Sequence, residues 1–168
     1  MRYVLLVVMF LVSLILPGTL FYFWSWSGIK PDLVMLLVIY YALHNRTRPA
    51  VIWGFSCGII QDLYLGRHLG MFAVAYSVVA LSSNWMAQRW SRDNFLLTVV
   101  MVLMGSVAGQ FVVAFLSLGA GVQWSWQDLL FLIFGVAVYN AILVPVTYPW
   151  VHRSFLQGWL RYRPKYER

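Results

Sequence analysis

The sequence contains few charged residues and almost no cysteine. Only 10% of its 168 residues are charged, whereas a soluble domain usually carries about a quarter. Because so few charges cannot cover a surface that faces water, lipid is the expected solvent, and the length suits one domain. The single cysteine, Cys57, excludes an internal disulfide and any metal site that needs several cysteines.

Groups that perform catalysis or hold ions are also scarce. The three histidines, His44, His68 and His152, lie far apart without a partner at i+4, so we predict no metal site. The chain has no glycine-rich phosphate loop and no pair of acids at helical spacing, so we predict no cofactor and no enzymatic activity. The net charge of +7 would suit nucleic acid, but the basic residues lie between apolar runs and in the C-terminal tail. That placement is typical of membrane proteins, and we predict no nucleic-acid partner.

Long apolar runs dominate what is present, and they predict an all-α integral membrane protein with six transmembrane helices. The approximate spans are 3–23, 32–44, 50–65, 71–88, 95–118 and 128–151. The first run has 21 uncharged residues, which as a helix reach about 30 Å, the thickness of a hydrocarbon core. Arg2 before it would also suit a signal peptide, but no small-residue cleavage site follows, so we predict an uncleaved span. The second and third runs are short for full spans, and a re-entrant pair is the alternative.

The distribution of basic residues predicts the orientation. With six spans and both termini in the cytoplasm, ten basic residues lie inside and only Lys30 and Arg67 lie outside. The inner set is Arg2, Arg46, Arg48, Arg89, Arg92, Arg153, Arg161, Arg163, Lys165 and Arg168. A re-entrant second and third run would instead turn Arg46 and Arg48 within the membrane, so six spans are favoured. Residues 152–168 then form a basic, aromatic cytoplasmic tail that lies on anionic headgroups or is solvated and disordered.

A pentapeptide in the third run, "GFSCG" at 54–58, has two interpretations. It matches the nucleophile pattern G-x-S-x-G, but that chemistry needs Ser56 on a sharp strand-to-helix turn with a histidine base in reach. The favoured interpretation is a small-residue face, made by Gly54 and Gly58, that lets another helix pack closely. Gly105 and Gly109 repeat the spacing in the fifth run, which suggests a second such face.

The connection after the third run contains an acid, a base and two glycines. Gly66 and Gly70 bracket a tight connection, and Asp62 lies just before it. An aspartate within a membrane is costly and is usually placed for a reason. Asp62 is expected to have a structural role, either pairing with Arg67 or binding backbone N–H groups. The alternative is a polar contact for a partner or ligand.

Two further polar features lie in the second and sixth runs. Pro31 followed by Asp32 fits a helix start, where the acid complements the helix dipole. In the sixth run, Asn140 is expected to make a hydrogen bond to another helix. Pro145 and Pro149 are expected to break the sixth helix near its cytoplasmic end, with a kinked helix as the alternative.

Three stretches together resemble one known family. "KPDLVMLLVIYYAL", "GFSCGIIQDLYLGRHLG" and "YNAILVPVTYPWV" are similar to the rod shape-determining protein MreD family of bacteria, over nearly the whole chain. The most specific part is the pattern on Gly54, Gly58, Asp62, Leu63, Gly66, Leu69 and Gly70. Asn140 and Pro145 reinforce the resemblance, whereas Arg67 is not part of the family pattern.

The resemblance implies a multi-pass protein of the bacterial cytoplasmic membrane in the machinery that inserts peptidoglycan along the wall of rod-shaped cells. The implied partners are MreC, a single-span protein with a large periplasmic domain, RodA with its transpeptidase partner, and the actin-like MreB. The resemblance also implies a fold similar to the substrate-binding subunits of energy-coupling-factor transporters. No enzymatic activity is attributed to the family.

We therefore expect a non-enzymatic membrane scaffold that contacts MreC through the small-residue faces. The alternative is a small-molecule-binding subunit of a membrane transporter, for which the outer-side "QDLYLGRHL" is the motivation. Few polar residues in the spans disfavour that alternative, because a hydrophilic vitamin needs polar groups around it. An intramembrane hydrolase that uses Ser56 is the third hypothesis.

Overall fold

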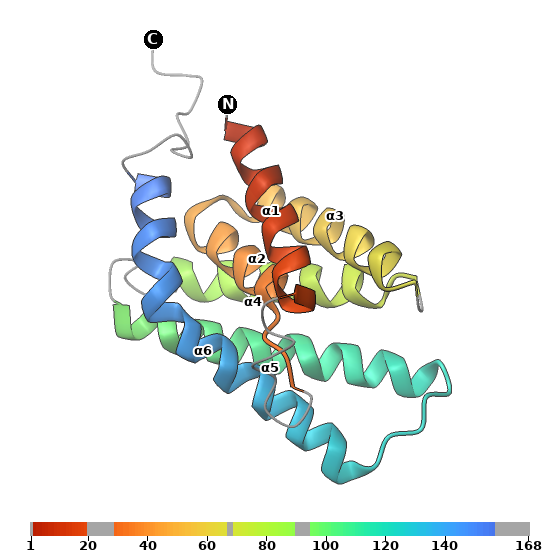
Figure 1. Cartoon of the computed structure of the whole chain (residues 1–168). Helices are drawn as coiled ribbons and strands as arrows, with labels where there is room; N and C mark the ends of the chain where they lie inside the picture. The colour runs from red at the N-terminus through yellow and green to blue at the C-terminus, as the bar shows by residue number, and fades with distance from the viewer. Residues whose placement is uncertain (1, 20–28, 67–68, 90–94, 157–168) are drawn as a thin grey trace.

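The chain folds into a bundle of helices, as the apolar runs predict. The computed structural model describes residues 2–19, 29–66, 69–89 and 95–156, and these residues form six helices (Figure 1). The helices are α1 (Arg2–Thr19), α2 (Leu33–His44), α3 (Thr47–Leu65), α4 (Met71–Arg89), α5 (Phe95–Gly119) and α6 (Trp126–Leu156). Each corresponds to one predicted run, with ends that shift by a few residues.

The surface of the bundle differs from that of a soluble protein. Large apolar side chains point outward on every helix around α2, and the interior contains some polar side chains among many apolar ones. Examples of the exposed set are Val4, Ile52, Leu81, Phe115 and Ile142. The buried polar residues are Asn45, Asp62, Ser83, Asn84, Thr98, Ser106, Gln110, Ser117 and Asn140. Exposed apolar area on this scale is typical of a membrane protein.

The described helices differ in length and in hydropathy. Two segments are long and apolar enough to cross a membrane, α5 and Trp126–Pro149 of α6. Val4–Thr19 and Leu33–His44 are apolar but shorter. Helices α3 and α4 have 19 residues each and are less apolar.

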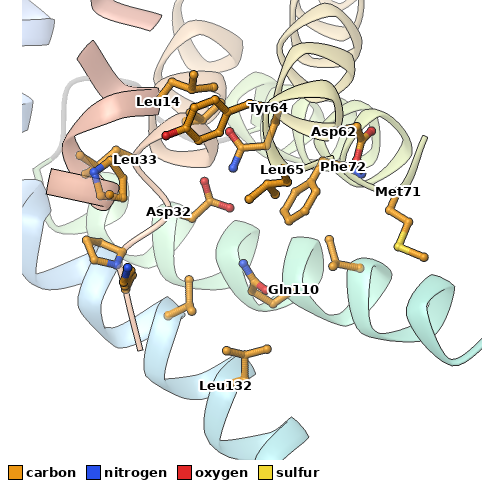
Figure 2. A pocket seen from close by; sticks show the side chains of 18 of the residues that line it. Leu14, Asp32, Leu33, Asp62, Tyr64, Leu65, Met71, Phe72, Gln110 and Leu132 are labelled. Atoms are coloured by element: carbon orange, nitrogen blue, oxygen red, sulfur yellow. Dashed lines mark hydrogen bonds between the residues drawn. The ribbon is translucent and has the colours of Figure 1, made fainter. Parts of the chain in front are cut away.

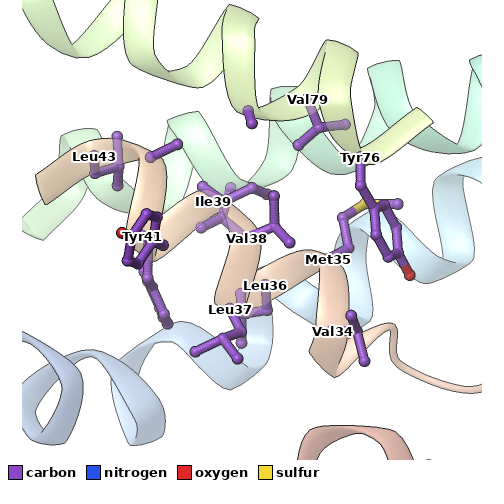
Figure 3. Close-up of a cluster of buried hydrophobic side chains, with 14 of the residues drawn as sticks. Val34, Met35, Leu36, Leu37, Val38, Ile39, Tyr41, Leu43, Tyr76 and Val79 are labelled. Carbon is purple, nitrogen blue, oxygen red and sulfur yellow. The ribbon is translucent and has the colours of Figure 1, made fainter. Parts of the chain in front are cut away.

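Helix α2 is the core of the bundle. All residues from Val34 to Leu43 are buried, and the other five helices all contact it. Its 12 residues extend about 18 Å, well short of a hydrocarbon core. A helix that is hydrophobic on every side must be enclosed, and Figure 3 shows its side chains among Tyr76 and Val79 of α4.

The two ends of the bundle differ in charge. The α2–α3 turn lies beside the end of α4, as a hydrogen bond from the Gln88 amide to the Thr47 hydroxyl at 3.1 Å shows. This contact brings Arg46, Arg48 and Arg89 to one end of the bundle. The start of α2 and the α3–α4 and α5–α6 connections lie at the other end (Figure 1).

The prolines of α6 do not break it, so the predicted interruption at Pro145 and Pro149 is wrong. The helix continues through both to Leu156. Membrane helices tolerate proline where neighbouring groups satisfy the freed backbone. Near these positions the Thr147 hydroxyl donates to the Leu143 carbonyl at 2.8 Å and also contacts the Tyr40 hydroxyl at 2.8 Å.

Candidate functional site

The carboxylate of Asp62 closes the start of α4. It is 2% exposed and accepts hydrogen bonds from the backbone N–H groups of Gly70 at 3.0 Å, Phe72 at 3.1 Å and Ala73 at 3.2 Å. The first N–H groups of a helix have no partner within it, and a negative charge there is favoured by the helix dipole. The expectation that Asp62 binds backbone N–H groups is confirmed.

Two glycines shape the connection that Asp62 supports. Gly66 ends α3 in the left-handed region, at φ 62°, and its N–H donates to the Asp62 carbonyl at 3.0 Å. Gly70 has φ 99°, which side-chain-bearing residues rarely adopt. Arg67 lies outside the described residues, so its pairing with Asp62 stays a prediction.

The glycine face of α3 packs against α4 of the same chain. A Cβ added to Gly54 would lie 2.6 Å from the Tyr76 carbonyl oxygen, and one added to Gly58 would lie 2.4 Å from the Ala73 Cα. Only glycine allows backbones to approach so closely. Of the two expected roles, helix packing and partner binding, the chain itself uses this face for packing.

The glycine face of α5 is occupied in the same way. A Cβ on Gly109 would lie 2.7 Å from Met35 of α2 and from Val79 of α4, and one on Gly105 would lie 3.1 Å from Ile39. Both small-residue faces are therefore filled within the bundle, that of α3 by α4 and that of α5 by α2 and α4. A partner helix would have to displace α2 or α4 to reach them.

A polar network that the sequence only partly predicts surrounds the start of α2. Asp32 is the N-cap, and its Oδ1 accepts from the Met35 N–H at 2.9 Å, so the predicted helix start is confirmed. The hydroxyl of Tyr76, which is fully buried on α4, donates to Oδ1 at 2.8 Å and to Oδ2 at 2.9 Å. Tyr76 had no distinguishing signal in the sequence, because its partner is 44 positions away.

Asn140 connects three helices at this point. Its Oδ1 accepts from the Asp32 backbone N–H at 3.0 Å, and its Nδ2 donates to the Ser106 hydroxyl at 3.0 Å. The expected interhelical hydrogen bond is confirmed. Pro145, one turn further along α6, is exposed.

Asn84, which the sequence analysis missed, satisfies the other end of α2. Its Nδ2 donates to the carbonyls of Ala42 and Asn45, both at 2.7 Å. Its Oδ1 accepts from Thr47 at 2.6 Å and from Gln88 at 2.8 Å. An asparagine in the middle of an apolar run is the only signal that could have pointed to it.

A cavity of about 670 Å³ lies beside the start of α2, at the end of the bundle opposite the arginines. Most of its wall is apolar, with Leu14 of α1 and Leu132 of α6 among the lining residues. Its polar lining includes Lys30, Asp32, Gln61 and Gln110. Figure 2 shows Asp32 and Gln110 beside the same space and Asp62 at its margin, beyond Phe72.

The geometry of Ser56 does not suit a nucleophile. It lies inside α3 rather than on a strand-to-helix turn, its side chain is exposed, and its hydroxyl donates to the Ile52 carbonyl at 2.9 Å. Nδ1 of His44 contacts the Tyr40 carbonyl at 2.8 Å, and the side chains of His68 and His152 lie outside the described ones. The described residues include no group of three His, Cys, Asp or Glu side chains that could hold a metal ion.

Comparison with known proteins gives one result. The family model of the rod shape-determining protein MreD matches residues 1–158. No curated protein and no solved structure matches the chain. The expected similarity to transporter subunits is therefore without support from solved structures, while the family match covers every described helix.

Proposed function

This chain belongs to the MreD family of rod shape-determining proteins, and from that premise we propose that it is a non-enzymatic scaffold of the cell-elongation complex. Family membership implies a role in determining rod shape and gives no precedent for enzymatic activity. The finer proposal is direct contact with MreC, and through it association with RodA, its transpeptidase partner and MreB.

The observation that supports this proposal is the continuous apolar face of α1. Val4, Val7, Val8, Leu11, Val12 and Ile15 are all exposed and recur every three or four residues along the helix. Helix α1 packs chiefly on α2, so this face has no covering helix within the described chain. Because the glycine faces are already filled, we place the single span of MreC against α1.

The proposed orientation puts the arginine-bearing end in the cytoplasm. Arg46, Arg48 and Arg89 lie together there, in agreement with the positive-inside rule. Arg89 also lies over the ring of the exposed Trp85, 4.0 Å from its centroid, as expected at the headgroup layer. Residues 152–168 would extend from this end onto anionic lipid, and both termini would be cytoplasmic.

In-membrane photo-cross-linking tests the scaffold proposal in living rod-shaped cells. A photoreactive residue at Val8 or Leu11 is expected to capture MreC, because both side chains lie on the proposed face. The matched control is Ile142, an equally apolar and exposed position on α6, which is expected to capture no MreC. Capture from Ile142 but not from Leu11 would move the contact away from α1. No capture from any exposed face of the bundle would contradict direct contact.

The cavity favours one second candidate, a small-molecule-binding subunit of a membrane transporter. Its volume lies in the range of ligand pockets, about 300–1,000 Å³. This candidate predicts that deleting the protein abolishes uptake of some small solute. Unchanged uptake across a panel of labelled vitamins would argue against it.

A further inference from the structure

Gln110 is a buried amide that the rest of the chain does not use. It lies on α5, is 7% exposed and lines the cavity. No hydrogen bond joins its side chain to another described residue. Buried amides are normally bonded, because an unpaired one keeps the cost of leaving water without compensation. Its amide can donate two hydrogen bonds and accept two.

A second glutamine repeats this situation from another helix. Gln61, one residue before Asp62 on α3, also lines the cavity. Its Oε1 is buried without a partner among the described residues. Asp62 beside it already accepts from three backbone N–H groups, whereas no described residue donates to the Gln61 amide oxygen.

Asp32 supplies a carboxylate at the same cavity. Its Oδ2 accepts from the Tyr76 hydroxyl at 2.9 Å, and a carboxylate oxygen accommodates two donors. Three polar side chains, Asp32 at the start of α2, Gln61 on α3 and Gln110 on α5, therefore line one cavity, and Figure 2 shows Asp32 and Gln110 at it. Asp32 and Gln110 each offer an oxygen that can accept a further donor.

The rest of the wall decides the kind of molecule that fits. It is largely hydrocarbon, with Leu14, Val113 and Leu132 among its residues, and it lies within a helical bundle immersed in lipid. We propose that the cavity binds the head of an amphiphile that carries a primary ammonium group. The ammonium would donate to Asp32 and to the Gln110 oxygen, the Gln61 amide group would bond the remaining head atoms, and the apolar part would follow the hydrocarbon wall.

The same chemistry could come from an aminophospholipid of the membrane or from a smaller amphiphilic amine. The charged lining residues are Lys30, Asp32 and Asp62, so acids outnumber bases and a purely anionic head is disfavoured, while a quaternary ammonium could donate no hydrogen bond. This inference is independent of the scaffold proposal, because it concerns the cavity and not the face of α1. Cross-linking to MreC can fail while the cavity still binds its ligand, and the converse also holds.

Native mass spectrometry of the full-length protein in detergent tests the proposal. The probes are phosphatidylethanolamine and phosphatidylcholine with identical acyl chains, which differ only in the three methyl groups on nitrogen. We expect about tenfold more bound phosphatidylethanolamine, since one to two net hydrogen bonds correspond to about that factor. Equal retention of both lipids would overturn the proposal, because it would show only unspecific annular lipid.

Substitutions at the cavity test whether the lipid binds there. Gln110→Leu is expected to remove the preference for phosphatidylethanolamine, and Gln61→Leu on a different helix gives a second chance if the first variant does not fold. The matched control is Gln127→Leu, at an exposed position near the start of α6, which should keep the preference. An unchanged preference in folded Gln110→Leu and Gln61→Leu would place the bound lipid elsewhere and overturn the assignment.

A third probe, decylamine, distinguishes the two sources. If decylamine displaces phosphatidylethanolamine, the cavity accepts any primary ammonium on an apolar chain, as proposed, and a smaller amine can be the ligand. If it does not, while the preference over phosphatidylcholine remains, the ligand is the aminophospholipid itself. Both outcomes support the ammonium chemistry and differ only in the source.

Discussion

The polar backbone groups at the two ends of the buried helix α2 find their hydrogen-bond partners in different ways. At its C-terminal end, Asn84 makes four hydrogen bonds to the α2–α3 turn and to α4, and it is completely enclosed. We call this the closed end. At the N-terminal end, Asp32 caps the helix beside a cavity that is also lined by Gln61 and Gln110. We call this the open end.

The difference shows at which end of α2 the protein has hydrogen-bonding groups that it does not use itself. Helix ends inside a bilayer must be satisfied by protein groups, because no water reaches them. The closed end meets this need with every bond filled, which is what a structural role requires. At the open end Asp32 and Asn140 also satisfy the backbone of α2, but the amides of Gln61 and Gln110 remain without partners among the described residues. Those extra groups have no structural purpose within the described chain.

Gly58→Ala would break both ends at once and should have the largest effect. Its methyl group would meet the α4 backbone at 2.4 Å, and α4 carries both Asn84 and Tyr76. We expect a loss of about 4 kcal/mol in the free energy of unfolding, because backbone cannot move aside as a side chain can. Unfolding by detergent titration measures it. Gly119→Ala, at a position with open space around it, should stay within about 0.5 kcal/mol of the unmodified protein. A similar small effect at Gly58 would contradict the close packing.

Asn84→Leu would break the closed end alone. It leaves the carbonyls of Ala42 and Asn45 without donors inside the bundle, so we expect a loss of about 3 kcal/mol. The same titration measures it. Gln88→Leu removes a side chain that bonds to Asn84 but is exposed, and it should cost less than about 1 kcal/mol. Equal costs at the two positions would mean that burial does not matter at this end.

Asp62→Asn would loosen the margin of the open end. The substitution keeps the shape but removes the charge that three N–H groups share, and its NH₂ group faces donors. We expect a loss of about 2 kcal/mol, with Asp128→Asn as the exposed control at about 0.5 kcal/mol. Backbone amide exchange at residues 70–73 should speed up in the first variant only. No change in exchange there would refute the capping role of Asp62.

Gln110→Leu would sharpen the comparison, because its effect should be small and of opposite sign. In protein stripped of lipid, replacing an unpaired buried amide by a hydrocarbon should raise the free energy of unfolding by about 1 kcal/mol. The same measurement on Asn84→Leu should show a large loss. A marked loss at Gln110 would reveal that its amide has a structural partner, and the two ends would then be equivalent.

Much of the architecture was predictable because it depends on local composition. Apolar runs of helical length predicted six helices, and the helix ends differ from the predicted ends by only a few residues. The role of Asp62 could also be predicted from the sequence, because an acid just before two glycines in an apolar chain has few uses. The prediction listed backbone N–H groups as one of two structural possibilities, and the start of α4 supplies them.

The rest depended on contacts between distant parts of the chain. Asn84 meets Ala42 across 42 positions and Tyr76 meets Asp32 across 44, and no local pattern connects them. The glycine faces were recognised, but not the helices that fill them. Pro145 misled because its local effect on a helix was weighed without the surrounding bundle. The cavity was not predictable, since it is defined by six helices meeting imperfectly.

The enclosure of α2 imposes an order on biosynthesis. The ribosome delivers this segment before the asparagines that complete its two ends, which arrive 42 and 108 positions later in the chain. Until then the backbone polar groups at the ends of α2 have no partner in the hydrocarbon. The nascent α1 and α2 must therefore stay beside the insertion machinery or a chaperone. A nascent chain that stops before α6 should therefore be a substrate for membrane quality control rather than a smaller stable protein.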